Sequence, residues 1–188
     1  MYIKSIENLI KAFKFLPGIG EKTSERLSYA FLEMNEDQAK TFLTFLNDAN
    51  TKIKKCLKCN NYSEDEICCL CKDINREQEI ICVVDSPKSI FSIEKLGIYK
   101  GKYFVLSNLI SPLNGINPED INISQLLDLI KTENCKEIIM AVAPNIEGET
   151  TSLYIKTILE NLNIKVSKLA SGIPIGVDMD YIDSITLE

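Results

Sequence analysis

The sequence predicts an α/β domain built on a parallel sheet, preceded by an all-α region and a small four-cysteine metal module. Amphipathic helical patterns fill residues 1–55, two Cys-x-x-Cys pairs follow within residues 56–72, and apolar runs alternate with helical patterns from residue 79 onward. Strands that alternate with helices are typical of a parallel sheet. We therefore expect domains at 1–55, 56–72 and 79–174, followed by a C-terminal segment at 175–188.

The composition of the 188-residue chain is that of a globular protein. Hydrophobic residues make up 45% of it, and no apolar run has the length of a membrane span, so we expect a cytoplasmic protein that does not enter membranes. The absence of histidine excludes Ser-His and Cys-His catalysis. Residues 1–55 carry nine Lys and Arg against seven Asp and Glu, whereas residues 56–188 carry twelve against twenty. A polyanion is therefore expected to meet the N-terminal part.

Helical periodicity divides the first part into three helices. The first ends near Phe15, and the third runs from about Glu36 to the lysines at 52–55. Between the first two helices lies the sequence Leu-Pro-Gly-Ile-Gly at 16–20, in which the proline discourages helix and the glycines allow left-handed backbone. Thr23 or Ser24 is expected to begin the second helix. The pattern predicts a tight hairpin between two helices.

A hairpin of this kind can bind a phosphate group. Glycines let the backbone approach the anion closely, and the amides at the start of the second helix point towards it. Lys22 and Arg26 lie four residues apart on one face of that helix, and Lys14 stands just before the hairpin. Glu21 and Glu25 count against an anion site but are expected on another face. The pattern favours sequence-independent DNA binding, although a plain turn between helices is the alternative. The residues expected to contact DNA are Lys14, Gly18, Gly20, Lys22 and Arg26.

The cysteines predict a metal site. Seven cysteines, an odd number, fit a reducing compartment better than a disulfide framework. Each Cys-x-x-Cys pair puts two sulfurs on one turn, and Cys68 is preferred to Cys69 because only Cys68 has this spacing to Cys71. The spacing does not match that of iron–sulfur clusters, and four thiolates would fill the shell of a structural zinc ion. Four buried thiols without metal are the alternative. The expected ligands of one Zn²⁺ per chain are Cys56, Cys59, Cys68 and Cys71.

Carboxylates follow two of the expected strands. Strands are predicted at 80–84, 103–106, 138–142 and 164–170, with helices at 89–96, 124–131 and 149–162. Asp85 ends the first strand, and Glu147 and Glu149 follow the third, where functional groups of parallel sheets collect. Such acids can bind Mg²⁺ for phosphoryl transfer. Because Asn145 stands where a second acid would help, helix capping or a partner surface is at least as good an interpretation, and Mg²⁺ is not the expected cofactor.

In the order of its parts the chain resembles the RecR family of bacterial recombination mediators over nearly its whole length. The matching segments are residues 16–26, the four cysteines, residues 82–84, 106–120, 146–151 and 172–176. The resemblance implies that the α/β part is a Toprim domain and that Lys22 and Arg26 contact DNA. It also implies that Asp85 and Glu147 are the remnant of the Toprim acidic site, which serves partner binding more than catalysis.

The same resemblance implies a non-enzymatic role in DNA repair. It implies that this chain binds double-stranded DNA and gapped junctions, forms a homo-tetramer or dimer, and works with RecO and RecF in loading RecA at single-stranded gaps. Two other hypotheses stay open from the residues. One is a Mg²⁺-dependent Toprim nuclease or nucleotidyl transferase using Asp85 and Glu147, and the other is an assembly scaffold that contacts only proteins.

Overall fold

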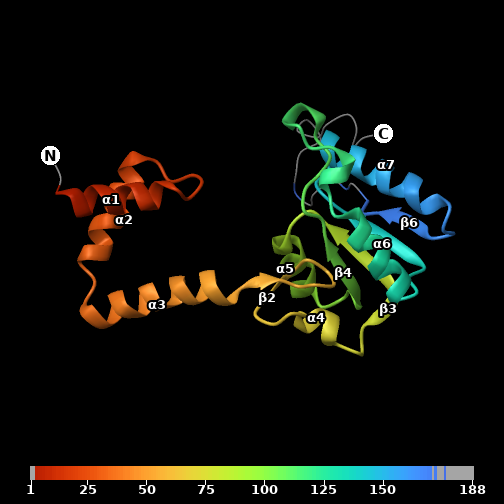
Figure 1. Ribbon diagram of the computed structural model, residues 1–188, viewed down its shortest axis with the longest axis horizontal. Coiled ribbons are helices and arrows are strands. Elements are labelled where there is room, and N and C mark those ends of the chain that lie inside the picture. The colour runs from red at the N-terminus through yellow and green to blue at the C-terminus, as the bar shows by residue number, and fades with distance from the viewer. Residues whose placement is uncertain (1–2, 171, 173–175, 177–188) are drawn as a thin grey trace. The chain divides into compact units, whose positions relative to one another are not determined.

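The computed structural model in Figure 1 describes residues 3–170, 172 and 176. The chain divides into two compact units, residues 1–52 and 53–188, and each is described by itself. Of the C-terminal segment expected at 175–188, all but Gly176 lies outside the described residues.

The first unit consists of three helices. They are α1 (Lys4–Lys14), α2 (Glu21–Leu32) and α3 (Glu36–Lys52). The side chain of Ile10 is buried where α1 packs on α2, and the rings of Phe31 and Phe42 join α2 to α3 with a centroid distance of 5.8 Å. Helix α2 begins earlier than predicted, because Gly20 in extended conformation is its N-cap. Ser24, one of the two predicted first residues, is instead buried inside the helix and donates its hydroxyl hydrogen to Glu21 O.

The second unit is built on a four-stranded sheet, as predicted. Its strands are β3 (Glu77–Val84), β4 (Gly101–Val105), β5 (Glu137–Ala141) and β6 (Lys165–Lys168). All neighbouring strands are parallel, in the order β4-β3-β5-β6. Its longer helices are α5 (Pro87–Leu96), α6 (Ile123–Thr132) and α7 (Ile146–Glu160).

Helices cover both faces of this sheet (Figure 1). Side chains that alternate along β3 form two cores, because successive residues of a strand point to opposite faces. Ile81 and Val83 pack with residues of α6 and α7, whereas Cys82 and Val84 pack with Ile90 of α5. Helix α5 begins shortly after β3 ends, and α7 begins shortly after β5 ends. Both helices therefore begin at the carboxyl edge of the sheet.

Helix α7 starts at Ile146, three residues before the predicted start at Glu149. The side chain of Asn145 caps it, because Asn145 Oδ1 accepts a hydrogen bond of 2.8 Å from Gly148 N. Glu147 and Glu149 consequently belong to the first turn of the helix and not to the loop before it.

Short elements of the second unit precede the sheet or connect its longer strands and helices. They are β1 (Lys54–Lys55), β2 (Tyr62–Ser63), α4 (Cys69–Lys72) and the 3₁₀ turns η1 (Pro112–Asn114) and η2 (Pro118–Asp120). Strands β1 and β2 pair antiparallel, a small hairpin that the periodicity did not predict because each strand has two residues. Over the part of the chain that is described, the helices are too short or too polar to cross a membrane.

Candidate metal centre and nucleic-acid interface

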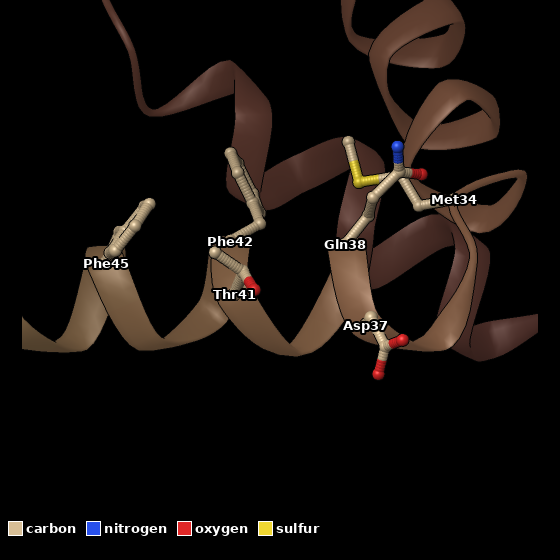
Figure 2. A pocket seen from close by; sticks show the side chains of 6 residues that line it. All are labelled: Met34, Asp37, Gln38, Thr41, Phe42 and Phe45. Carbon is tan, nitrogen blue, oxygen red and sulfur yellow. The ribbon is translucent and has the colours of Figure 1, made fainter.

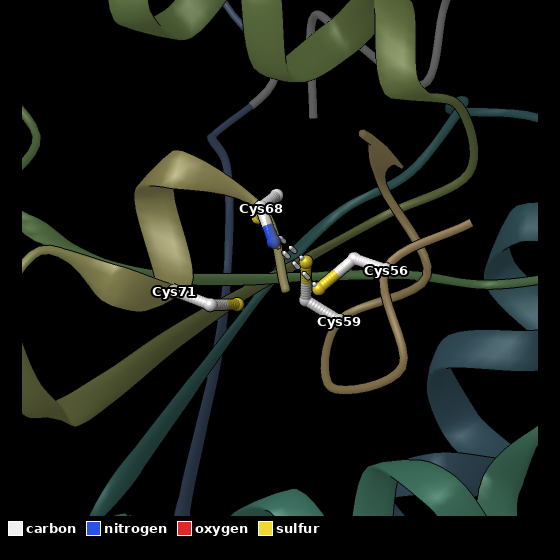
Figure 3. Close-up of side chains that lie close together, drawn as sticks. All are labelled: Cys56, Cys59, Cys68 and Cys71. Carbon is white, nitrogen blue, oxygen red and sulfur yellow. Dashed lines mark hydrogen bonds between the residues drawn. The ribbon is translucent and has the colours of Figure 1, made fainter. Parts of the chain in front are cut away.

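Four cysteine side chains converge between the β1–β2 hairpin and α4 (Figure 3). The Sγ atoms of Cys56, Cys59, Cys68 and Cys71 all lie within 4.8 Å of one another, and Cys59 Sγ is 3.5 Å from Cys68 Sγ. Zn–S bonds of about 2.3 Å in a tetrahedron would place the sulfurs about 3.8 Å apart. Cys68 belongs to this group of sulfurs, as predicted, whereas the neighbouring Cys69 is exposed and does not belong to it. This set of donors fits a tetrahedral metal ion.

Backbone hydrogen bonds shape the two turns that carry these sulfurs. Asn60 N donates to Cys56 O over 2.9 Å, and Asn60 itself has a φ of 62°, a left-handed conformation that asparagine tolerates. In the second pair, Cys71 N donates to Cys68 O over 3.1 Å. Cys68 N donates to Cys56 Sγ over 3.2 Å and so links the two turns, as amides around metal thiolates do.

The thiols perturb one another. The hydrogen bond between Cys59 and Cys68 holds the pKa of Cys68 well below its ordinary value, since the thiolate of Cys68 accepts it. The same bond raises the pKa of Cys59, which keeps the shared proton. A metal ion binds thiolates, so it would take the place of this proton.

The metal module is attached to the sheet by polar contacts at the end of β4. Val105 N donates to Cys59 O over 2.8 Å, and Asn60 Nδ2 donates to Val105 O over 3.0 Å. Lys102 is 4% exposed, and its ammonium group donates to three carbonyl oxygens at the end of α4. These acceptors are Leu70 O at 3.2 Å, Cys71 O at 3.2 Å and Asp73 O at 2.8 Å.

Sequence reasoning missed Lys102. The signal in the sequence is a single lysine directly before the apolar run at 103–106. A charge buried beside such a run requires hydrogen-bonding partners. The pattern could have marked Lys102 as buried, but it does not indicate that the partners belong to the metal module.

The hairpin of the helical unit contains two glycines, and one of them has the left-handed backbone that the sequence predicts. Gly18 has a φ of +80°, the left-handed region that favours glycine. Gly20 is extended with a φ of −86°, and a Cβ placed on it would meet nothing within 4 Å. The first amides of α2, after Gly20, have no acceptor within the helix, so they can bind an anion.

Three cations were predicted beside this hairpin, and the structure distinguishes among them. Lys22 and Arg26 are exposed on α2, and no ion pair involves either within the described residues. Lys14 instead forms an ion pair with Glu21. Glu21 was expected away from the cations, but Lys14 reaches it from the other helix. Of the three predicted cations, Lys22 and Arg26 are therefore the two whose charge no ion pair compensates within the described residues.

The carboxylates at the end of the sheet have partners within the chain. Asp85 Oδ2 accepts from Ala143 N over 3.0 Å, which ties the end of β3 to the loop after β5. Glu149 forms an ion pair with Lys168, and Glu147 lies half-buried in the first turn of α7. Among residues 3–170, 172 and 176, the cysteine cluster is the one group of three or more Cys, Asp or Glu ligands close enough for a metal. The three acids do not form a second such group.

Two family models match the chain. The model of the RecR helix-hairpin-helix matches residues 6–50, and that of the Toprim domain matches residues 79–170. Together with the fold and the cysteine cluster, they define the class: a helix-hairpin-helix protein with a Toprim domain and a four-cysteine site.

The chain is also similar to curated proteins over its whole length. It is 43% identical to the recombination protein RecR of Staphylococcus haemolyticus over 186 residues, which are 99% of this chain and 94% of that relative. It is 40% identical to the recombination protein RecR of Natranaerobius thermophilus over 187 residues, which are 100% of this chain and 94% of that relative. The chain belongs to the RecR family, as its motifs predicted.

Proposed function

We propose that this protein is a DNA repair and recombination mediator that binds DNA through the hairpin, without sequence preference and without catalysing a reaction. The observation that carries the proposal is the pair of exposed, uncompensated cations Lys22 and Arg26 at the start of a helix that follows Gly18 and Gly20. Backbone amides and two cations recognise phosphate, which is the same at every nucleotide. Lys14, which is paired with Glu21, would contribute less to the positive potential.

We propose a structural zinc ion at the four cysteines. Its four thiolate ligands would complete the tetrahedral shell and leave no position for an activated water. The sulfur spacing and the burial of Cys56, Cys59 and Cys68 support this assignment.

We propose that the acidic end of the sheet serves partner binding. Asp85 and Glu149 already bind groups of their own chain, which argues against Mg²⁺ coordination by these acids. The partners implied by the family resemblance are RecO and RecF, with which the protein would promote RecA loading at single-stranded gaps in the bacterial cytoplasm. Magnesium-dependent cleavage or joining of DNA that is lost in Glu147→Gln would refute the non-enzymatic role.

We also propose a homo-oligomer, a tetramer or a dimer, in which α3 contacts a second copy. None of the 17 residues of α3 is buried, and Phe45 and Leu46 are 68% and 54% exposed. Figure 2 shows Phe42 and Phe45 on one side of α3, in a hollow that extends to Met34. Such an apolar surface is typical of a protein interface. Phe45→Ser with Leu46→Ser should lower the mass in solution, whereas Thr44→Ser should not.

The hairpin is tested by a salt titration of DNA binding. Lys22→Ala with Arg26→Ala should weaken binding of a labelled duplex at least tenfold at low salt and reduce the slope of log affinity against log salt by about 2, since each phosphate contact contributes about 0.9. Lys4→Ala with Lys11→Ala removes the same charge from α1 and is the matched control. Unaltered binding by the hairpin variant across the titration would refute the assignment. A wild-type protein that binds no DNA by itself would favour the scaffold.

A further inference from the structure

A groove on the α/β unit lies between the metal module and α5, and the proposed function makes no use of it. The metal module contributes Tyr62 and Leu70, and α5 contributes Pro87, Lys88 and Phe91. Its volume is about 610 Å³, within the range of about 300–1,000 Å³ that small-ligand sites have. The groove is therefore large enough for a nucleotide or a few side chains of a partner.

Two aromatic rings of this groove are exposed to solvent. Tyr62 is 60% exposed on β2, and Phe91 is 74% exposed on α5. Neither ring is needed to fill a core, in contrast to Tyr103, which is 1% exposed in the same unit. Exposed rings on the walls of one groove mark a binding site, and a flat ligand is the partner that aromatic faces fit best.

Two lysines lie next to these rings. Lys55 is the register partner of Tyr62 in the β1–β2 pair, and Lys88 is exposed in the first turn of α5. No ion pair involves either lysine within the described ranges 3–170, 172 and 176. Their charges are available to an anionic ligand.

The acidic side chain in the lining of the groove is compensated. Glu94 forms an ion pair with Arg76 and accepts a hydrogen bond of 2.6 Å from Tyr103 Oη. Its charge therefore does little to repel an anion, although the unit as a whole is acidic. Stacking faces combined with free cations are the features by which proteins bind single-stranded nucleic acid, whereas a purely apolar peptide would leave both lysines unused.

We propose that this groove binds unpaired nucleotides of single-stranded DNA, with Tyr62 and Phe91 stacking on bases and Lys55 and Lys88 contacting phosphates. This inference rests on the proposed function, because it assumes that the protein acts on DNA. The hairpin takes no part in the contact between the groove and the single strand. A duplex cannot use the groove in this way because its bases are stacked on one another. The two DNA sites would thus recognise different states of DNA, the duplex at the hairpin and the single strand at the groove.

The chain lacks tryptophan, so a single introduced tryptophan reports on one place. We would titrate zinc-loaded Phe91→Trp with an oligothymidine of about 15 nucleotides. Saturable quenching of its emission is expected. Ile74→Trp, at a position 85% exposed outside the groove lining, is the matched control and should keep its emission. The titration is repeated with Lys22→Ala and Arg26→Ala added, where quenching should persist, so that failure of the hairpin assignment and failure of the groove are distinguished.

Affinity provides the second readout. Tyr62→Ala should weaken binding of a labelled oligothymidine about tenfold, and Lys88→Ala should reduce its salt dependence, while duplex binding through the hairpin is unchanged in both. Ile74→Ala should change neither. Emission of Phe91→Trp that is unaffected by the oligonucleotide would overturn the proposal. So would groove variants that bind the oligonucleotide normally but lose association with a partner protein, which would identify the groove as a peptide site.

Discussion

The buried ammonium group of Lys102 allows a quantitative test of how the metal module is held on the sheet. Its three hydrogen bonds to Leu70 O, Cys71 O and Asp73 O join β4 to the end of α4, which carries Cys71 of the four-cysteine cluster. Lys102→Met keeps the length and the apolar stem of the side chain but removes all three donors. The carbonyls at the end of α4 would then lose their partners.

Hydrogen bonds from a charged donor contribute about 1.5–3 kcal/mol each, and the cost of burying the ammonium group offsets part of the total. We therefore expect Lys102→Met to lower the free energy of unfolding by about 3 kcal/mol. Metal release should be at least tenfold faster, because about 1.4 kcal/mol corresponds to a factor of ten.

Urea unfolding of the zinc-loaded protein measures the first quantity, and transfer of zinc to a coloured chelator measures the second. Lys100→Met is the matched control, since Lys100 is exposed just before the same strand. If Lys102→Met and Lys100→Met have equal unfolding free energies and equal release rates, Lys102 does not hold the module, and the reasoning is refuted.

Three further predictions concern single positions. Gly18→Ala should destabilise the protein by about 1 kcal/mol in thermal unfolding, because its φ is +80°, while Gly20→Ala, with open space around it, should cost less. Gly148→Ala should lower the melting temperature strongly, since the new Cβ would lie 1.9 Å from Ala143 O; an unchanged melting temperature would contradict the close approach. Cys69→Ser should retain full zinc content by elemental analysis, whereas replacing any of the four clustered cysteines should reduce it.

The chain's local features could be predicted from its sequence because each depends on neighbouring residues. The two Cys-x-x-Cys turns need only two cysteines three positions apart, and the four-sulfur group follows once the turns meet. The hairpin at 16–20 follows from proline and glycine, and the apolar runs predict the strands β3, β4 and β5. Helix starts were less accurate: the caps Gly20 and Asn145 lie before the apolar pattern from which those helices were predicted.

Which polar groups meet depends on how the elements pack. This packing paired Lys14 with Glu21 across the hairpin, because two helices approach there, and it bound Asp85 to the backbone of the loop after β5. It buried Lys102 under the metal module and placed Tyr62 beside α5, although long stretches of chain separate these segments. Such contacts depend on strand order and packing, and the periodicity and spacing of residues carry no information about either. Residue patterns along the chain are enough to define its helices, strands and cysteine turns, whereas the packing of the chain decides which charged side chains form ion pairs among the described residues.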